Sequence, residues 1–360
     1  MTVAQSCCGP STGEKSARFR LVLLLVLMLG LSGQLWAAEP ILIRFSHALP
    51  QETPRGQAIE KFKALAESYT RGRVRVEVHH DGRLFSHRDE LKALQRNQVQ
   101  MLAPELSALA TLDLPAFEVF DLPYLFPSLE VVHRVVDGEP GRSLFAQLET
   151  KPVIGLAWWD DGFRQLGTNR PLRSLSRLKG LRIAISPSSV LTEQMKALGA
   201  RPRPVFAPEQ LPGLQQGGLD GIETTFSTFY ALKLHSQPSH LTISDHGYQG
   251  YAVVANRRFW QGLPPGVRTQ LERALRETTS FERTTARRAN LEALARIRAA
   301  GTTTIHILSD AERLNGHRML LPVHQAFEPR LGRGLIQSIY RAAAQVEAGT
   351  ADGSVPAEGR

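Results

Sequence analysis

The chain has 360 residues, of which 42% are hydrophobic and 21% charged, values that are ordinary for a soluble globular protein and exclude wholesale disorder. At about 150 residues per domain, this length predicts two domains or one large one. Lys and Arg number 43 against 34 Asp and Glu, which gives a net charge of +9. Because the charges are spread along the chain without a long basic block, they indicate a weak preference for anionic partners and not a nucleic-acid-binding protein.

The first 38 residues are typical of a secretory signal peptide. Basic residues between positions 15 and 20 precede the apolar run 21–31, and Ala37 and Ala38 supply a small-residue cleavage site. The run is shorter than the roughly 20 residues of a transmembrane helix, although an uncleaved signal anchor is the alternative. Cys7 and Cys8 lie inside this segment, so the exported protein should hold no disulfide. We therefore expect a periplasmic protein that is held together by its core alone.

Strand and helix patterns alternate from position 41. An apolar run at 41–45 and a period-2 pattern at 74–78 predict strands, with a helical stripe at 59–69 between them. A helix about 89–96 and a strand at 99–103 follow. This βαβαβ order predicts a parallel α/β sheet.

A second α/β rhythm follows the turn-rich residues 160–162. We expect 152–159 and 251–255 to cross between two lobes, and the chain beyond 255 to be mostly helical, with apolar stripes at 267–275 and 331–343. Further strands are predicted at 181–185, 203–206 and 219–222, and a helix is predicted at 191–198.

These patterns predict an α/β fold with two lobes, crossing strands and long C-terminal helices, as in a periplasmic solute-binding protein. The expected segments are a signal peptide at 1–38, lobe I at 39–161 plus 250–290, lobe II at 162–249, C-terminal helices packing across both lobes at 291–348, and a disordered tail at 349–360.

Catalytic signatures are absent from the sequence. It contains no phosphate-binding glycine loop, dinucleotide fingerprint, HExxH or GxSxG string. Ser176 and Lys179 form only a short, common S-x-x-K, and the run 79–81 (His-His-Asp) is more simply a strand end than a metal site. We therefore expect no enzyme, no cofactor and no metal. An exported two-lobed α/β protein without catalytic residues suits a binding protein that holds a small ligand between its lobes.

The chain resembles the solute-binding subunits of tripartite ATP-independent periplasmic (TRAP) transporters, in particular the branch that binds C4-dicarboxylates. The resemblance covers most of residues 41–340. The matching strings are IRFSHALPQETPRGQ at 43–57, VFDLPYLF at 119–126, GLAWWDDGFRQL at 155–166, LKGLRI at 178–183, ALGARP at 197–202, GGLDGIET at 217–224 and SDHGYQGYAVVANRRFW at 244–260.

This resemblance implies a monomeric binding protein that delivers an organic acid to TRAP membrane permease subunits. In the family an arginine binds the ligand carboxylate in a bidentate manner, through two of its guanidinium nitrogens. That arginine falls at the position of Ala184 here, and a family asparagine falls at Thr224. A second basic position of the clamp is kept as Arg164.

The two changed positions leave three hypotheses. In the first, Arg182 compensates, because residues two apart on a strand point to the same face. In the second, the ligand is larger or less anionic, and Ala184 leaves room for it. In the third, solute binding has decayed and the protein serves sensing.

Four further residues are candidate ligand contacts. His47 follows the first strand, at the sheet end where ligands of α/β folds bind, although a surface role is the alternative. Glu105 stands where the family has a small polar residue, and its carboxylate would repel a diacid or attract a cation. Trp159 and Tyr248 flank the crossing strands and could line the site or simply pack in the core.

Overall fold

The computed structural model describes residues 1–2, 4, 39–237 and 240–351. Contacts divide the chain into Met1–Glu39 and Pro40–Arg360, and every element below belongs to the second unit. Most of the predicted signal peptide and residues 352–360 of the predicted tail lie outside the described residues. Within the described ranges, no helix combines the length and apolarity that a membrane crossing needs.

One sheet has five strands in the order β2-β1-β3-β10-β4. β1 pairs in parallel with β2 and β3, which confirms the predicted βαβαβ start. β10, however, runs antiparallel to both β3 and β4, so the sheet is mixed. The strands are β1 (Ile41–Ser46), β2 (Val74–His79), β3 (Met101–Leu102), β4 (Val153–Phe163) and β10 (Tyr248–Asn256).

The second sheet has six strands in the order β11-β9-β5-β8-β6-β7. They are β5 (Gln165–Thr168), β6 (Arg182–Ile185), β7 (Arg201–Pro204), β8 (Gly221–Thr224), β9 (His240–Ile243) and β11 (Thr304–Ile307).

Two sequence predictions for the second sheet are wrong. The strand predicted at 203–206 ends at Pro204, because Phe206 instead precedes a helix whose Glu209 accepts its backbone N–H. β11 lies in a region expected to be helical. Its side chains are exposed or half-buried, so it lacks an apolar pattern, and its partner β9 is distant in sequence.

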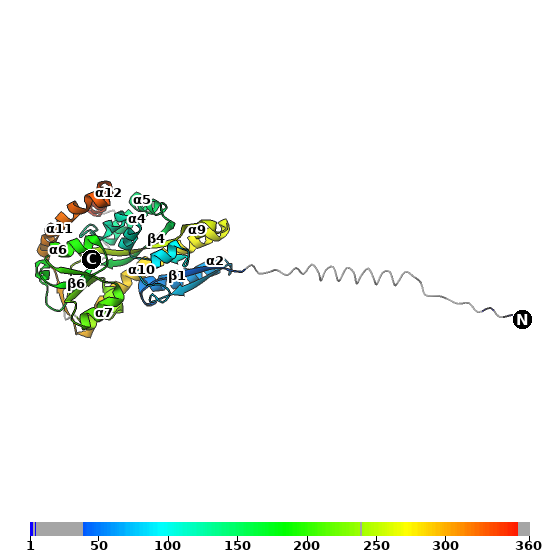
Figure 1. The fold of residues 1–360 in the computed structure, drawn as a ribbon, viewed down its shortest axis with the longest axis horizontal. Helices are drawn as coiled ribbons and strands as arrows, with labels where there is room; N and C mark the ends of the chain where they lie inside the picture. The colour runs from blue at the N-terminus through cyan, green and yellow to red at the C-terminus, as the bar shows by residue number, and fades with distance from the viewer. Residues whose placement is uncertain (3, 5–38, 238–239, 352–360) are drawn as a thin grey trace. The chain divides into compact units, whose positions relative to one another are not determined.

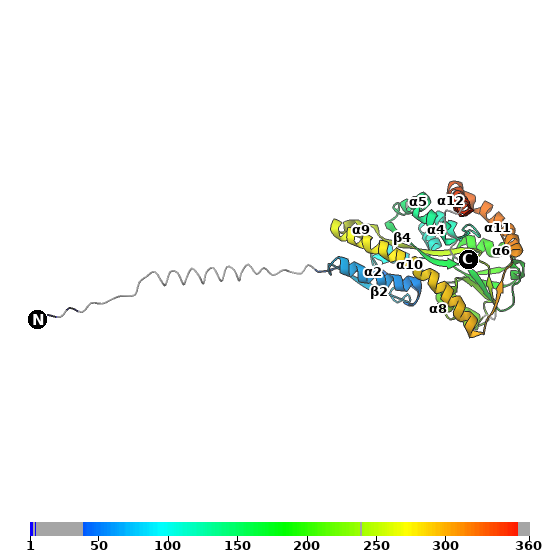
Figure 2. The same cartoon turned by 180° about the vertical axis from the view of Figure 1, so that it is seen from behind.

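Helix α10 (Pro265–Ala300) links the two sheets. It packs against α2 (Pro54–Tyr69) and β4 and also against α8 (Phe226–Ala231), as Figure 2 shows. The boundary proposed at 290 falls inside this continuous helix, and the division into lobes remains a proposal.

The predicted C-terminal stripe at 331–343 is divided between two helices. α11 (Asp310–Leu331) ends at Gly332, whose φ of 99° is easy only for glycine, and α12 (Arg333–Ala351) follows. α11 packs against α6 (Ser189–Ala197), and α12 packs against α4 (Leu129–Asp137) (Figure 1).

The remaining helices are short. They are α3 (Glu90–Gln95), α5 (Glu139–Leu148), α7 (Ala207–Gln215), α9 (Arg257–Gly262) and the 3₁₀ helices η1 (Leu106–Leu112), η2 (Pro115–Asp121), η3 (Leu175–Leu178) and η4 (Leu234–Ser236).

Candidate functional site

Arg164 lies between β4 and β5 and is 1% exposed. Its backbone N–H donates to the Gly247 carbonyl at 2.7 Å, and its Nε donates to the Tyr248 carbonyl at 3.4 Å. One terminal nitrogen donates to Asp121 Oδ1 at 3.3 Å, whereas the other terminal nitrogen, Nη1, is buried without a hydrogen-bond partner. A buried guanidinium keeps its charge, so the free donor is suited to an anion.

Asp121, at the end of η2, pairs only weakly with Arg164 and so competes weakly with a ligand anion for this guanidinium. Burial raises its pKa to about 6, although the charge of Arg164 and a hydrogen bond from Ser188 oppose that rise. Its second oxygen, Oδ2, also lacks a partner. The pair is therefore joined through only one oxygen and leaves part of each group available.

Glu223 on β8 brings a second buried carboxylate toward Arg164. It accepts hydrogen bonds from His246 Nε2 at 2.8 Å and from Gln194 Nε2 at 3.3 Å. Burial alone would raise the pKa of Glu223, but the His246 hydrogen bond and the charge of Arg164 lower it. Its Oε2 has no partner.

A second buried guanidinium, that of Arg55, comes from the first turn of α2. Arg55 is 2% exposed, donates to the Ala103 carbonyl at 2.7 Å and lies 4.1 Å over the Tyr251 ring. Its Nε has no partner. Burial raises the pKa of the Asp161 carboxyl on β4, and the charge of Arg55 opposes part of that rise.

His47 lies beside Arg55 and is 1% exposed. Burial, and then the charges of Arg55, His80 and His87, lower the pKa of His47 to about 2. Its Nε2 is 2.6 Å from His80 Nδ1, and its Nδ1 is buried without a partner. The ring is therefore neutral at physiological pH.

Glu105 connects the two arginine regions electrostatically. Its charge acts on Arg164 and Asp121 and also on Tyr251, which packs against Arg55. Its backbone also bridges to Tyr251. The structure thus groups Arg164, Glu105 and His47 of the predicted candidates into one buried polar region, which also contains residues that the sequence analysis did not single out: Arg55, Asp121, Asp161, Glu223 and His246.

The remaining second-lobe candidates are placed differently. Arg182 donates to Asp220 through two of its three guanidinium nitrogens, from Nε at 2.9 Å and from Nη2 at 2.8 Å, and is one-third exposed. Ala184 is fully buried in an apolar cluster that includes Ile222 and Phe229. Thr224 is 4% exposed on β8 and pairs with Gln165.

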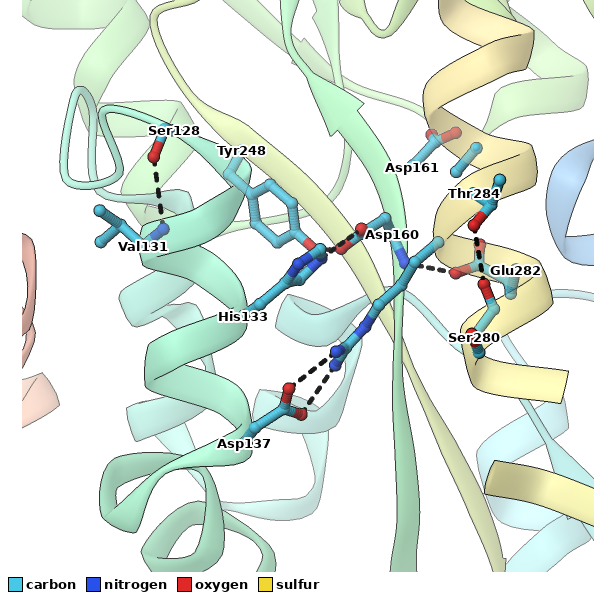
Figure 3. Close-up of polar contacts among 12 residues, drawn as sticks. Ser128, Val131, His133, Asp137, Asp160, Asp161, Tyr248, Ser280, Glu282 and Thr284 are labelled. Atoms are coloured by element: carbon cyan, nitrogen blue, oxygen red, sulfur yellow. Dashed lines mark hydrogen bonds and ion pairs between the residues drawn. The ribbon is translucent and has the colours of Figure 1, made fainter. Parts of the chain in front are cut away.

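Trp159 and Tyr248 lie on the paired strands β4 and β10, respectively. Trp159 stacks on Phe45 in the core of the first sheet and donates its Nε1–H to Thr279 at 3.2 Å. The Tyr248 hydroxyl donates to Asp160 Oδ1 at 2.6 Å, and His133 Nε2 reaches Asp160 Oδ2 at 2.7 Å (Figure 3). Of these two candidates, Tyr248 contacts Arg164 through its backbone carbonyl.

Among the described residues, no group of three or more His, Cys, Asp or Glu side chains is arranged to hold a metal ion. His80, from the His-His-Asp run, instead contacts His47 and Glu60.

Two mixed β-sheets with helices packed against them, joined by the long helix α10, are the architecture of a two-lobed solute-binding protein. Residues 45–330 match the family described as bacterial extracellular solute-binding protein, family 7, and the chain belongs to this family. It is 43% identical over 308 residues to the C4-dicarboxylate-binding periplasmic protein DctP of Rhodobacter capsulatus, a match that covers 86% of this chain and 92% of that protein.

Solved structures support the same assignment. A TRAP periplasmic solute-binding protein from Shewanella oneidensis with bound succinate matches with a TM-score of 0.82 and 34% identity, over 84% of this chain and 99% of that one. One from Pseudomonas aeruginosa with bound L-malate matches with a TM-score of 0.78 and 34% identity, over 80% and 100%.

These matches confirm the predicted resemblance and the two-lobed α/β fold class. Because the family consists of substrate-binding proteins of transporters, they also confirm that the chain is not an enzyme.

Proposed function

We propose that this chain binds a small organic acid of the C4-dicarboxylate type and that Arg164 is the main contact for one carboxylate. The observation that carries the proposal is the fully buried Arg164 guanidinium with an unpartnered Nη1. An unpaired buried donor costs free energy, which a ligand carboxylate would recover. The dicarboxylates named for DctP of Rhodobacter capsulatus and for the succinate-bound relative have the matching chemistry.

Arg55 is our proposed contact for the second acidic group. Its Nε is also buried without a partner. Arg55 belongs to α2, which precedes β4 in the chain, whereas Glu223 follows β4. Two separate cations fit a ligand with two anionic ends better than a ligand with one. Glu105, whose charge acts on Arg164 and Tyr251, would then favour a ligand that also carries a hydrogen-bond donor.

The changed clamp positions support our choice of Arg164 as the carboxylate contact. Arg182 is a poor substitute for the missing arginine, because Asp220 already occupies its guanidinium. A less anionic solute, or a sensory or degenerate paralogue, is the alternative; the named ligands of the relatives favour an organic acid.

Delivery to TRAP membrane subunits also belongs to this proposal, as do export to the periplasm by the segment 1–38 and a monomeric state. Delivery and export are supported by the family and the TRAP proteins that match this chain. Uptake of labelled acid by cells that express the chain with such membrane subunits tests delivery.

The test of the ligand contact is calorimetric titration with succinate and L-malate. Arg164→Gln should lower the affinity at least about 30-fold, since breaking a buried charge pair costs roughly 2–5 kcal/mol and about 1.4 kcal/mol equals a factor of ten. The control is Arg182→Gln, for which we expect a change below about threefold, because Arg182 is paired with Asp220.

Far-ultraviolet circular dichroism and thermal unfolding should show that both variants are folded. An Arg164→Gln variant that is folded and keeps the affinity within about threefold would contradict the proposed contact. Failure of both acids to bind the unaltered protein would contradict the dicarboxylate assignment.

A further inference from the structure

His47, His80 and Glu60 form a hydrogen-bonded chain at the end of the first sheet. His47 follows β1, and His80 follows the neighbouring parallel strand β2. The His47 backbone N–H donates to the His79 carbonyl at 2.9 Å, which fixes the two strand ends side by side. His47 Nε2 lies 2.6 Å from His80 Nδ1, and His80 Nε2 lies 2.9 Å from Glu60 Oε1 on α2.

The order of these atoms determines where the protons lie. An ionised carboxylate only accepts hydrogen bonds, so His80 Nε2 must carry the proton that it shares with Glu60. In a neutral His80 ring, Nδ1 is then the acceptor. His47 Nε2 consequently carries a proton and donates it to His80. His47 Nδ1 is left with a lone pair.

That lone pair lies in the buried polar region. His47 is 1% exposed, its Nδ1 has no partner, and the charge of Arg55 acts on the ring. His80 and His87 also act electrostatically on the ring. Because burial, and then the charge of Arg55, oppose a charge on His47, its pKa falls to about 2 and Nδ1 stays unprotonated. A buried acceptor without a donor is a cost that a ligand hydroxyl can remove.

On the basis of the function proposed above, we propose that Glu60 and His80 hold His47 in the Nε2–H tautomer, and that His47 Nδ1 accepts a hydrogen bond from a ligand hydroxyl. The protein would therefore select a hydroxylated diacid, of the 2-hydroxysuccinate type, over the unsubstituted diacid. His47 is a specificity-determining residue in this arrangement, and His80 and Glu60 position it.

The experiment measures the ratio of the affinities for L-malate and succinate at pH 8, well above the ordinary pKa of an imidazole. We expect the unaltered protein to prefer L-malate about tenfold, which equals ~1.4 kcal/mol and is typical of one hydrogen bond. In Glu60→Gln, the amide can turn its NH₂ toward His80 Nε2 and allow the opposite tautomer. This variant should reduce the preference to about twofold or less.

Glu67→Gln is the matched control. Glu67 lies on the same helix, and its Oε1 accepts a hydrogen bond from the Val76 backbone, which an amide oxygen can replace. The control should keep the preference for L-malate. A second measurement, ¹⁵N NMR of the imidazole nitrogens without ligand at pH 8, should show an unprotonated Nδ1 for His47 in the unaltered protein.

Several outcomes would overturn the inference. They are equal affinities for the two acids, a preference for succinate, an unchanged ratio in Glu60→Gln, or a protonated Nδ1 in the NMR spectrum. Both proposals are supported if Arg164→Gln weakens the binding of both acids and Glu60→Gln, unlike the control, removes the preference for L-malate. If the unaltered protein binds neither acid, the proposed function fails and the specificity inference fails with it.

Discussion

Arg164 is held more loosely than a structural buried arginine usually is. Its nearest carboxylate, Asp121, makes a single contact of 3.3 Å, and Nη1 has no partner. Buried ion pairs are stable only when the remaining donors and acceptors are also satisfied. The incomplete pairing therefore indicates that a ligand completes it.

Asp121 should make ligand binding depend on pH. Its pKa is raised to about 6 by burial, so the carboxyl gains a proton as the pH falls through this value. Protonation removes the negative charge that competes with the ligand for Arg164. We expect the affinity for L-malate to rise between about pH 8 and pH 6, by at most about tenfold for each unit by which the ligand raises this pKa.

Calorimetry in two buffers of different ionisation enthalpy measures this linkage as proton uptake on binding. Asp121→Asn should abolish the uptake and bind the acid at pH 8 at least as tightly as the unaltered protein does. Proton release on binding, or the same uptake in Asp121→Asn, would show that another group is responsible.

At the scale of elements, the paired strands β4 and β10 and the helix α10 are joined by buried polar contacts. Asp160 on β4 accepts from Tyr248 on β10 and lies 2.7 Å from His133 on α4, and its own N–H donates to Glu282 on α10 at 2.9 Å (Figure 3). Glu282 is fully buried. Four elements that are distant in sequence are thereby held in one arrangement.

Glu282 should make stability fall with rising pH. Burial, and then the charge of Asp160, raise its pKa well above the ordinary value. Above the pKa of the unfolded state, the unfolded chain is ionised while the folded protein keeps the proton, so the free energy of unfolding decreases as pH rises. Glu282→Gln keeps an acceptor for the Asp160 N–H and cannot ionise. Relative to the unaltered protein, this variant should gain stability from about pH 5 to pH 8, by at most ~1.4 kcal/mol per pH unit.

Urea unfolding at several pH values measures this difference. Glu277→Gln is the control on the same helix, because the Tyr69 hydrogen bond lowers the pKa of the exposed Glu277 and no gain with pH is expected. A difference between Glu282→Gln and the unaltered protein that does not change with pH would refute the assignment.

For the whole molecule, the candidate site draws on both sheets. Arg55 and His47 adjoin the five-stranded sheet, whereas Glu223 lies on β8 of the six-stranded sheet and Arg164 precedes β5. A ligand that contacts both groups binds only when the two sheets are correctly placed. Ligand binding should therefore stabilise the folded molecule as a unit.

L-malate at 100 times its dissociation constant should raise the free energy of unfolding by about 2.7 kcal/mol. For a protein of this size, the Tm should rise by about 5 °C in a single transition. Differential scanning calorimetry checks the shift. With an affinity at least about 30-fold lower, Arg164→Gln should show at most about one third of it at the same concentration. Two transitions of which only one moves would mean that the ligand contacts one sheet alone.

Local patterns in the sequence were sufficient for most of the elements and for the class of protein. The alternation at 74–78 predicted β2, and the strings about Arg164 predicted the family that the comparisons confirmed. These features depend on neighbours along the chain, so a single sequence contains them. The strand β11 was missed because its stability comes from pairing with β9, which is distant in sequence.

The composition of the site was decided by tertiary structure. Arg182 and Arg164 are both arginines in family motifs. Only the fold shows that Arg182 is partly exposed and doubly bonded to Asp220, whereas Arg164 is buried with one nitrogen unpartnered. Arg55, and the relay from Glu60 to His47, depend on the distance between side chains from different elements. Burial, which sets the protonation of His47 and Asp121, is a property of the packed molecule and not of the local sequence.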